Sequence, residues 1–295
     1  MIAVKIRARS ISVRILICNE IFSKWPCCLA FRTTNRSLTL FGQLHRLGMG
    51  FQIDEIMTSP RKKHPIIGIT TYGRDVNKNF YLPADYVDSV RRAGGLPVML
   101  APGETQIGEI IEAVGGVIFA GGGDIDPGRY GGNPHPSISR VDHERDSFEF
   151  ELFGALLDLK KPTLGICRGS QLFSVATGAQ LIVHMPDEVG NAVRHRTDDG
   201  KEVEHTVDID GQSRLSRILE ATHKVKVISK HHQGLRSVSE TWRISAHAPD
   251  GTIEAFEHKL HPWMLAVLWH PEMARKDKTQ QKLFAAFVGA CKEII

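Results

Sequence analysis

From Pro65 onward, the chain alternates short apolar runs with longer stretches in which apolar residues recur every three or four positions. Runs of this length are typical of buried strands, and the recurring pattern is typical of helices that cover a sheet. Strands that alternate with helices pair in parallel through right-handed crossovers, so the pattern predicts an α/β fold with a doubly wound, mainly parallel sheet. The expected strands are residues 66–70, 96–100, 117–120 and 162–166, and the expected helices are residues 83–93, 107–114, 142–160 and 168–177.

After residue 200, the pattern changes to short strands that are separated by turn signals such as Pro249-Asp250-Gly251. This arrangement predicts antiparallel strands that extend the parallel sheet. The expected strands are residues 203–209, 224–229, 243–247, 253–256 and 264–268, and a closing helix is expected over residues 280–291.

Residues 1–60 differ from the remainder, because their apolar residues show no sustained period. We expect a disordered N-terminal extension here and one globular domain over residues 61–295. The extension is rich in arginine, contains serine and carries few acids, as organellar transit peptides do. The alternative is that translation starts at Met57, in which case the preceding residues do not belong to the protein.

Composition narrows the class of protein. Hydrophobic residues make up 42% and charged residues 24% of the 295 residues, as in ordinary soluble proteins. Much of the positive charge lies in the first fifty residues, so the body gives no electrostatic reason to expect nucleic-acid binding. No apolar run reaches the roughly 18 residues of a membrane span. Only Cys167 and Cys291 lie in the body, which argues against a disulfide framework and for the reducing cytoplasm.

The stretch Lys161–Met185 carries the candidate nucleophile. Cys167 lies between Gly165 and Gly169, at the junction of a predicted strand and a predicted helix. A tight turn at this junction requires small neighbours and places the thiol at the N-terminus of the helix. The helix dipole there is expected to lower the pKa of the thiol and to raise its reactivity. The alternative is a buried, inert cysteine.

A candidate base follows the strand predicted at residues 264–268, in the sequence Trp269-His270-Pro271-Glu272. Residues two apart in an extended segment point to the same side, so His270 and Glu272 can face one site. Pro271 favours the extended form for His270. Alone, this segment predicts only a strand end, but together with Cys167 it predicts a triad in which a carboxylate orients an imidazole that exchanges protons with a thiol.

Three glycines, Gly121 to Gly123, follow the strand predicted at residues 117–120. Ligands bind at the carboxyl ends of parallel strands, and a glycine loop there can turn backbone N–H groups toward an anion. Neither of the common phosphate-loop motifs is present. The alternative is a plain surface loop.

Histidines gather in the strand-rich half of the chain. Their spacings match no compact ligand set, so the sequence predicts no metal site, and the expected chemistry requires no cofactor. The histidines concerned are His195, His205, His231, His232 and His247.

Several stretches carry a family resemblance. They are GGGDIDPGRYGG, RDSFEFEL, KPTLGICRGSQLFSVATGAQL, HHQG, APDGTIEAFE and LWHPE, within residues 65–291. On these motifs the sequence resembles the class I glutamine amidotransferase-like peptidases, and among them the γ-glutamyl-γ-aminobutyrate hydrolases. Ser174 and Leu268 depart from the residues that this family often has, which leaves the substrate preference open.

The resemblance implies a flavodoxin-like form of the fold. It implies that Cys167 is the nucleophile, His270 the base and Glu272 the residue that orients the base. The implied oxyanion hole consists of backbone N–H groups, those of Gly122, Gly123 and Arg168. The residues expected to contact the substrate are Gln171, His231, His232 and Gln233.

The implied reaction is hydrolysis of the γ-glutamyl amide bond of a γ-glutamyl amine. A thioester forms, and glutamate and the free amine are released, as in polyamine catabolism. Two alternatives remain, a glutaminase subunit that delivers ammonia to a synthetase and a non-enzymatic redox sensor. The expected partner is the small-molecule substrate, with neither nucleic acid nor membrane, and a homodimer is left open.

Overall fold

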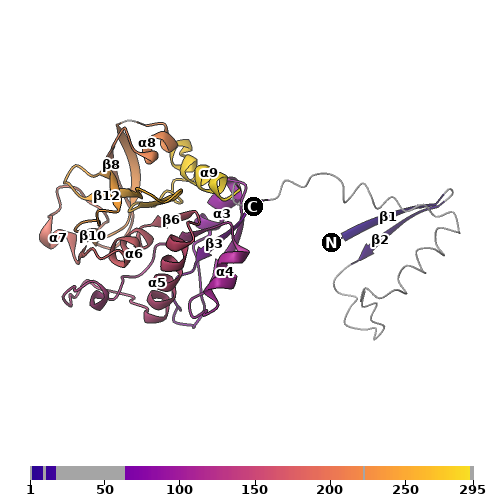
Figure 1. Cartoon of the computed structure of the whole chain (residues 1–295), viewed down its shortest axis with the longest axis horizontal. Helices are drawn as coiled ribbons and strands as arrows, with labels where there is room; N and C mark the ends of the chain where they lie inside the picture. The colour runs from indigo at the N-terminus through magenta and orange to yellow at the C-terminus, as the bar shows by residue number, and fades with distance from the viewer. Residues whose placement is uncertain (1, 9–10, 18–63, 222, 293–295) are drawn as a thin grey trace. The chain divides into compact units, whose positions relative to one another are not determined.

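A computed structural model describes residues 2–8, 11–17, 64–221 and 223–292 (Figure 1). The chain divides into two compact units, residues 1–62 and 63–295. In the first unit, β1 (Ile2–Ala8) and β2 (Ile11–Ile17) pair as an antiparallel hairpin. Hydrophobic residues occupy every second position in both strands, which is a strand pattern. The expectation for the extension as a whole stays a prediction. The remainder of the predicted extension, with Met57, lies outside the described residues.

Nine strands of residues 64–292 form one sheet, in the order β4-β3-β5-β6-β13-β12-β11-β8-β9. They are β3 (Ile66–Thr70), β4 (Leu96–Leu100), β5 (Gly116–Phe119), β6 (Thr163–Ile166), β8 (Val203–Ile209), β9 (Lys224–Ser229), β11 (Trp242–His247), β12 (Ile253–His258) and β13 (Met264–Val267). Two short strands, β7 (Leu181–Ile182) and β10 (Gly234–Leu235), pair separately.

The sheet has a parallel part and an antiparallel part. Strands β4, β3, β5, β6 and β13 are parallel to one another, and their order along the sheet is the 2-1-3-4-5 order of flavodoxin-like folds. The remaining strands, β12, β11, β8 and β9, pair antiparallel and extend the sheet beyond β13. The structure confirms the predicted α/β fold, including the added antiparallel strands.

Helices cover both faces of the sheet. They are α3 (Ala84–Arg92), α4 (Ile107–Ala113), the short 3-10 helix η2 (Pro127–Arg129), α5 (His143–Asp158), α6 (Arg168–Ala176), α7 (Met185–Glu188), α8 (Arg214–Leu219) and α9 (Lys278–Lys292). Strand β5 shows the two faces: Ile118 belongs to the core that includes residues of α3 and α9, whereas Val117 and Phe119 belong to the core that includes residues of α4, α5 and α6. In the described residues, no helix is both long and apolar enough to cross a membrane.

Candidate active site

Cys167 occupies a strained turn between β6 and α6. Its φ of 52° and ψ of −106° lie in a region that residues other than glycine rarely adopt. The neighbouring glycines are required for steric reasons: a Cβ at Gly169 would lie 2.3 Å from the carbonyl oxygen of Phe119, and a Cβ at Gly165 would lie 2.9 Å from the backbone of Gly169. This geometry is the strand, tight turn and helix that the sequence predicted.

The candidate base lies on the neighbouring strand. Strands β6 and β13 are parallel, so Cys167 and His270 both follow carboxyl ends at the same edge of the sheet. The Cys167 N–H donates to the Val267 carbonyl oxygen at 2.9 Å. The distance between His270 Nδ1 and Glu272 Oε1 is 2.6 Å, so the carboxylate orients the imidazole as expected for a triad.

Charges around His270 favour the protonated imidazole. Burial alone would lower the pKa of His270, but the Glu272 carboxylate and Cys167 outweigh burial and raise the pKa well above its ordinary value. Tyr86 lies nearby and accepts a hydrogen bond from the Gly121 N–H at 3.0 Å. Burial raises the pKa of Tyr86 as well, so this phenol stays neutral beside the triad. The site therefore favours a protonated His270 beside Cys167.

The glycine loop packs directly on the triad. A Cβ at Gly121 would lie 3.0 Å from His270 Cε1 and 3.5 Å from Cys167 Cβ, so a side chain there would crowd the site. Among the hydrogen bonds of the described residues, none uses the N–H groups of Gly122, Gly123 or Arg168 as a donor. These groups remain available for an oxyanion, and their role stays a prediction.

Next to the turn at Cys167 lies a buried set of charges that we call the arginine network, formed by Arg145, Asp146, Glu149 and Arg168. The Arg168 guanidinium pairs with both Asp146 and Glu149, and Arg145 Nε lies 3.0 Å from Glu149 Oε1. Arg145 Nη2 also donates to the carbonyl oxygens of Ala120 at 3.0 Å and Gly121 at 2.8 Å. The network thus fixes the start of α6 and the glycine loop to α5.

Sequence reasoning missed the role of this network. The sequence predicted the helix but assigned no role to its charged residues, although a signal was present. Asp146 and Glu149 stand three apart, and Arg145 precedes Glu149 by four, so all three fall on one helix face beside Phe148 and Leu152 of the core. Charges at core positions of a helix indicate buried ion pairs.

Two of the predicted substrate contacts, Gln171 and Gln233, lie together. Gln171 Nε2 donates to the Gln233 carbonyl oxygen at 3.3 Å, which joins α6 to the segment before β10. Gln233 Nε2 donates to the Tyr130 hydroxyl at 3.4 Å. The structure therefore places both glutamines close to the helix that carries the nucleophile, while their contact with substrate stays a prediction.

The two predicted histidine contacts have other partners. His232 Nε2 lies 3.1 Å from Asp124 Oδ1, and His232 Nδ1 lies 3.2 Å from His184 Nδ1. His231 Nδ1 donates to the Gln233 carbonyl oxygen at 3.0 Å, and its Nε2 faces Glu254. Both rings have both nitrogens turned to protein atoms, so the structure does not support His231 and His232 as polar contacts for a substrate.

A pocket of about 320 Å³ adjoins the site and is lined by Tyr72, Gly123, Arg168 and several other residues. Three of its arginines have carboxylate partners: Arg74 pairs with Glu144, and Arg145 and Arg168 belong to the arginine network. Arg140 also lines the pocket, and no ion pair among the described residues includes it. Arg140, whose backbone approaches Gly123, is therefore a pocket arginine without an ion pair among the described residues.

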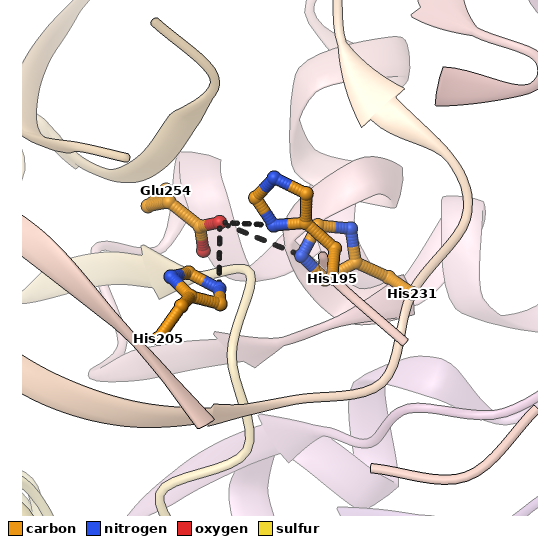
Figure 2. A group of neighbouring side chains, drawn as sticks. All are labelled: His195, His205, His231 and Glu254. Carbon is orange, nitrogen blue, oxygen red and sulfur yellow. Dashed lines mark ion pairs between the residues drawn. The ribbon is translucent and has the colours of Figure 1, made fainter. Parts of the chain in front are cut away.

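Three histidines that are far apart in sequence meet around one carboxylate (Figure 2). His195, His205 and His231 each direct a ring nitrogen toward Glu254, and the four side chains could hold a metal ion. The expectation of no metal site was based on the spacing of these histidines along the chain. That spacing does not reveal the set, because separate strands bring its members together in the folded protein. We call these four residues the histidine cluster.

The chain is similar in sequence to proteins named as an amidotransferase and as a hydrolase. "Putative glutamine amidotransferase Rv2859c" of Mycobacterium tuberculosis is 35% identical over 235 residues, which are 77% of this chain and 74% of that protein. "Gamma-glutamyl-gamma-aminobutyrate hydrolase PuuD" of Escherichia coli is 30% identical over 225 residues, which are 72% of this chain and 87% of that protein.

A solved structure shares the fold. It is that of a protein described as a "putative gmp synthase subunit a" from Thermoplasma acidophilum, with a TM-score of 0.57 and 14% identity over 79% of this chain and 97% of that chain. The model of the family described as Peptidase C26 matches residues 65–272. Since this match covers more than half of the chain, the protein belongs to the peptidase C26 family of class I glutamine amidotransferase-like proteins.

Proposed function

We propose that the protein is a cysteine-dependent hydrolase of γ-glutamyl amides, with Cys167 as nucleophile, His270 as acid and base, and Glu272 as the residue that orients His270. One observation carries the proposal: a strained thiol at a helix N-terminus shares one sheet edge with an imidazole whose Nδ1 lies 2.6 Å from a carboxylate oxygen. This combination is that of a nucleophile with its base and orienter.

In the first half of the reaction, the Cys167 thiolate attacks the γ-carbonyl carbon and the carbonyl oxygen becomes an oxyanion. The backbone N–H groups of Arg168, Gly122 and Gly123 stabilise that charge, since they have no other acceptor among the described residues. The tetrahedral intermediate collapses when the C–N bond breaks. His270 donates its proton to the departing amine, which leaves a thioester on Cys167.

In the second half, neutral His270 takes a proton from water, and the resulting hydroxide attacks the thioester carbonyl. Collapse of the second tetrahedral intermediate breaks the C–S bond, releases glutamate and restores the thiolate next to the imidazolium. Glu272 stays ionised throughout and stabilises the cation that forms twice in each cycle. The reaction consumes one water and yields one glutamate and one amine.

The pocket beside the glycine loop supports recognition of the glutamyl group. Substrates of this class carry an α-carboxylate, and Arg140 is the pocket arginine that has no carboxylate partner among the described residues. A guanidinium binds a carboxylate through two parallel hydrogen bonds. We infer that Arg140 binds the α-carboxylate, so that Arg140→Ala raises KM for every γ-glutamyl substrate more than it lowers kcat.

A glutaminase that serves a synthetase is the second candidate, because the Mycobacterium tuberculosis relative carries the name of an amidotransferase. Steady-state assays of glutamate release by the purified chain separate the two candidates, with γ-glutamyl-γ-aminobutyrate and glutamine as substrates. A hydrolase uses the non-reacting amine portion for transition-state binding, so we expect kcat/KM for the extended amide to be about ten- to two-hundred-fold higher. Equal cleavage of glutamine would overturn the hydrolase and favour the glutaminase.

A further inference from the structure

The histidine cluster draws its members from four separate parts of the sheet-rich half. His205 lies on β8 and Glu254 on β12, while His195 follows α7 and His231 follows β9. Glu254 Oε1 lies 3.1 Å from His195 Nδ1 and 3.5 Å from both His205 Nε2 and His231 Nε2 (Figure 2). All four side chains are at least nine-tenths buried.

In each ring we call the nitrogen that faces Glu254 the inner nitrogen and the other one the outer nitrogen. The hydrogen bonds of the outer nitrogens show which nitrogen of each ring carries the lone pair. His231 Nδ1 donates to the Gln233 carbonyl oxygen at 3.0 Å, and His205 Nδ1 donates to the Thr206 carbonyl oxygen at 3.1 Å. A carbonyl oxygen only accepts, so both rings carry a proton on the outer nitrogen. In a neutral imidazole the inner nitrogen then presents a lone pair toward Glu254.

The inner atoms lack hydrogen-bond partners. In the described part of the chain, His195 Nδ1, His205 Nε2, His231 Nε2 and both carboxylate oxygens of Glu254 are buried without one. Buried polar atoms are nearly always satisfied, so these five atoms, four of which lie within 4.8 Å of one another, require an explanation. Two lone pairs, those of His205 Nε2 and His231 Nε2, therefore face the Glu254 carboxylate, and a cation between these groups would remove their repulsion.

We propose that His195, His205, His231 and Glu254 bind one Zn²⁺ ion. Tetrahedral zinc with ligands at about 2.0–2.1 Å separates those ligands by roughly 3.3–3.4 Å, close to the spacing of the cluster about Glu254 Oε1. Three imidazoles and one carboxylate suit zinc, whereas calcium and magnesium prefer oxygen ligands. The four ligand atoms all lie within 4.8 Å of one another, so small ring rotations bring them onto one ion.

The surroundings of the cluster are those of a metal site. His195 Nε2 lies 2.9 Å from Asp250 Oδ2, and the outer nitrogens of His205 and His231 donate to carbonyl oxygens. Metal-bound histidines almost always donate their second N–H to a carboxylate or a carbonyl, which fixes the tautomer. Four protein ligands fill a tetrahedral site, so this zinc is structural and leaves no position for a catalytic water.

A zinc ion at the histidine cluster would hold together the strands that are hydrogen-bonded to the segment with His270. The Glu254 carbonyl oxygen accepts the Leu268 N–H at 2.7 Å, and the Ile228 carbonyl oxygen accepts the His270 N–H at 2.8 Å. His231 and Gln171 both donate to the Gln233 carbonyl oxygen. Zinc therefore ties β8, β9 and β12 together behind the strand that leads to His270.

The test measures zinc and cobalt binding by the metal-stripped full-length chain, with a chromophoric chelator as competitor for zinc. Cys167 and the cysteines before residue 30 could also bind zinc through thiolates, so Cys167→Ser is measured beside the wild type. We expect one equivalent of zinc in both, and a cobalt spectrum of a tetrahedral site without thiolate charge-transfer bands. Zinc should also raise the melting temperature of both.

Matched variants decide whether the cluster is the site. His205→Ala and Glu254→Gln each remove a ligand and should weaken zinc binding by more than about 100-fold, which is the upper range for loss of a residue that only orients a ligand. His247→Ala, on the neighbouring strand β11, is the control and should bind zinc as the wild type does. Circular dichroism of the metal-free variants shows whether each one folds. Absence of a tight equivalent in the wild type, or an unchanged equivalent in folded Glu254→Gln, would overturn the proposal.

Discussion

The arginine network and the histidine cluster are both buried and charged, yet they differ in how their charges are satisfied. In the arginine network two guanidiniums meet two carboxylates, and Nη2 of Arg145 donates to two carbonyl oxygens. In the histidine cluster one carboxylate meets three imidazoles, and the atoms that face inward have no hydrogen-bond partner among the described residues. The first set is complete within the protein, whereas the second needs a cation.

The two sets therefore stabilise the domain in different ways. The arginine network holds Cys167 and the glycine loop in place without a bound ion, although the desolvation of its charges makes its net contribution to stability small. A cluster of ligands contributes to stability only when its ion is bound, because binding free energy then becomes folding free energy. Variants in the active site or the arginine network should therefore change turnover or stability and leave zinc affinity unchanged, and variants in the histidine cluster should change zinc affinity.

The largest expected effect belongs to the nucleophile. Cys167→Ala should lower kcat for γ-glutamyl amides by at least about 10⁴-fold, because no other group can form the thioester. Zinc stoichiometry and melting temperature should stay near wild type. Burial raises the pKa of the other core thiol, Cys291, to about 12, so that thiol stays neutral and Cys291→Ala is the control. Loss of turnover in Cys291→Ala alone would show that the nucleophile is misassigned.

The next effect concerns the arginine network. Glu149→Ala leaves two buried guanidiniums short of a partner and should cost about 3–5 kcal/mol of unfolding free energy in urea. It should also lower kcat, because Arg145 and Arg168 hold the loop and the start of α6. Zinc affinity should not change. Glu151→Ala, an exposed acid of the same helix, is the control, and equal stability of the two variants would refute the role of the network.

Glu149 also predicts how stability depends on pH. Burial would raise its pKa, but the charges of Arg145 and Arg168 outweigh burial, and the pKa in the folded protein is lowered. Because the folded pKa is lowered, ionised Glu149 stabilises the folded protein at pH values above its unfolded pKa of 4.5. This stabilisation is lost as the pH falls through the folded pKa of Glu149. Glu149→Gln should therefore lose less stability than the wild type during acid titration, and identical slopes would contradict this assignment.

Metal removal should have a smaller effect, confined to the histidine cluster. With free zinc at about 100 times its dissociation constant, the bound ion adds about 2.7 kcal/mol, which a chelator removes. For a domain of this size each kcal/mol shifts the melting temperature by roughly 2–4 °C. The wild type should melt lower after chelation, whereas His205→Ala should not respond. A chelator effect of equal size in both would locate the metal elsewhere.

The sequence predicted what is encoded locally. Strands 66–70, 96–100, 203–209 and 224–229 agree with the structure at both ends, because each is a short apolar or alternating run between turn signals. The turn at Cys167 was predicted for the same reason: the strand, the small neighbours and the helix that make this turn are contiguous in the chain.

Features built from distant segments were not predicted. The histidine cluster depends on the register between β8 and β9 and on the place of β12 in the sheet, and no local pattern encodes those pairings. Of the short elements, β7, β10, α7 and α8 were missed, since two to six residues carry too little periodicity to be recognised. The role of Arg168 was not predicted, because its partners Asp146 and Glu149 lie on α5 and meet it only in the folded protein.

The smallest expected effect separates the ligands from the residue that orients them. Asp250 accepts the Thr252 N–H through Oδ1 at 3.0 Å and lies next to His195 Nε2 through Oδ2. In Asp250→Asn, the Thr252 N–H continues to donate to the side-chain oxygen, so the side-chain N–H₂ faces His195 Nε2. Nε2 must then accept a hydrogen bond, and the ring proton moves to Nδ1, the atom that faces Glu254. Zinc affinity should fall about 10- to 100-fold, less than in His205→Ala. Asp208→Asn, exposed on β8, should bind zinc as the wild type does, and an unchanged affinity in Asp250→Asn would show that the tautomer of His195 is set by something other than Asp250.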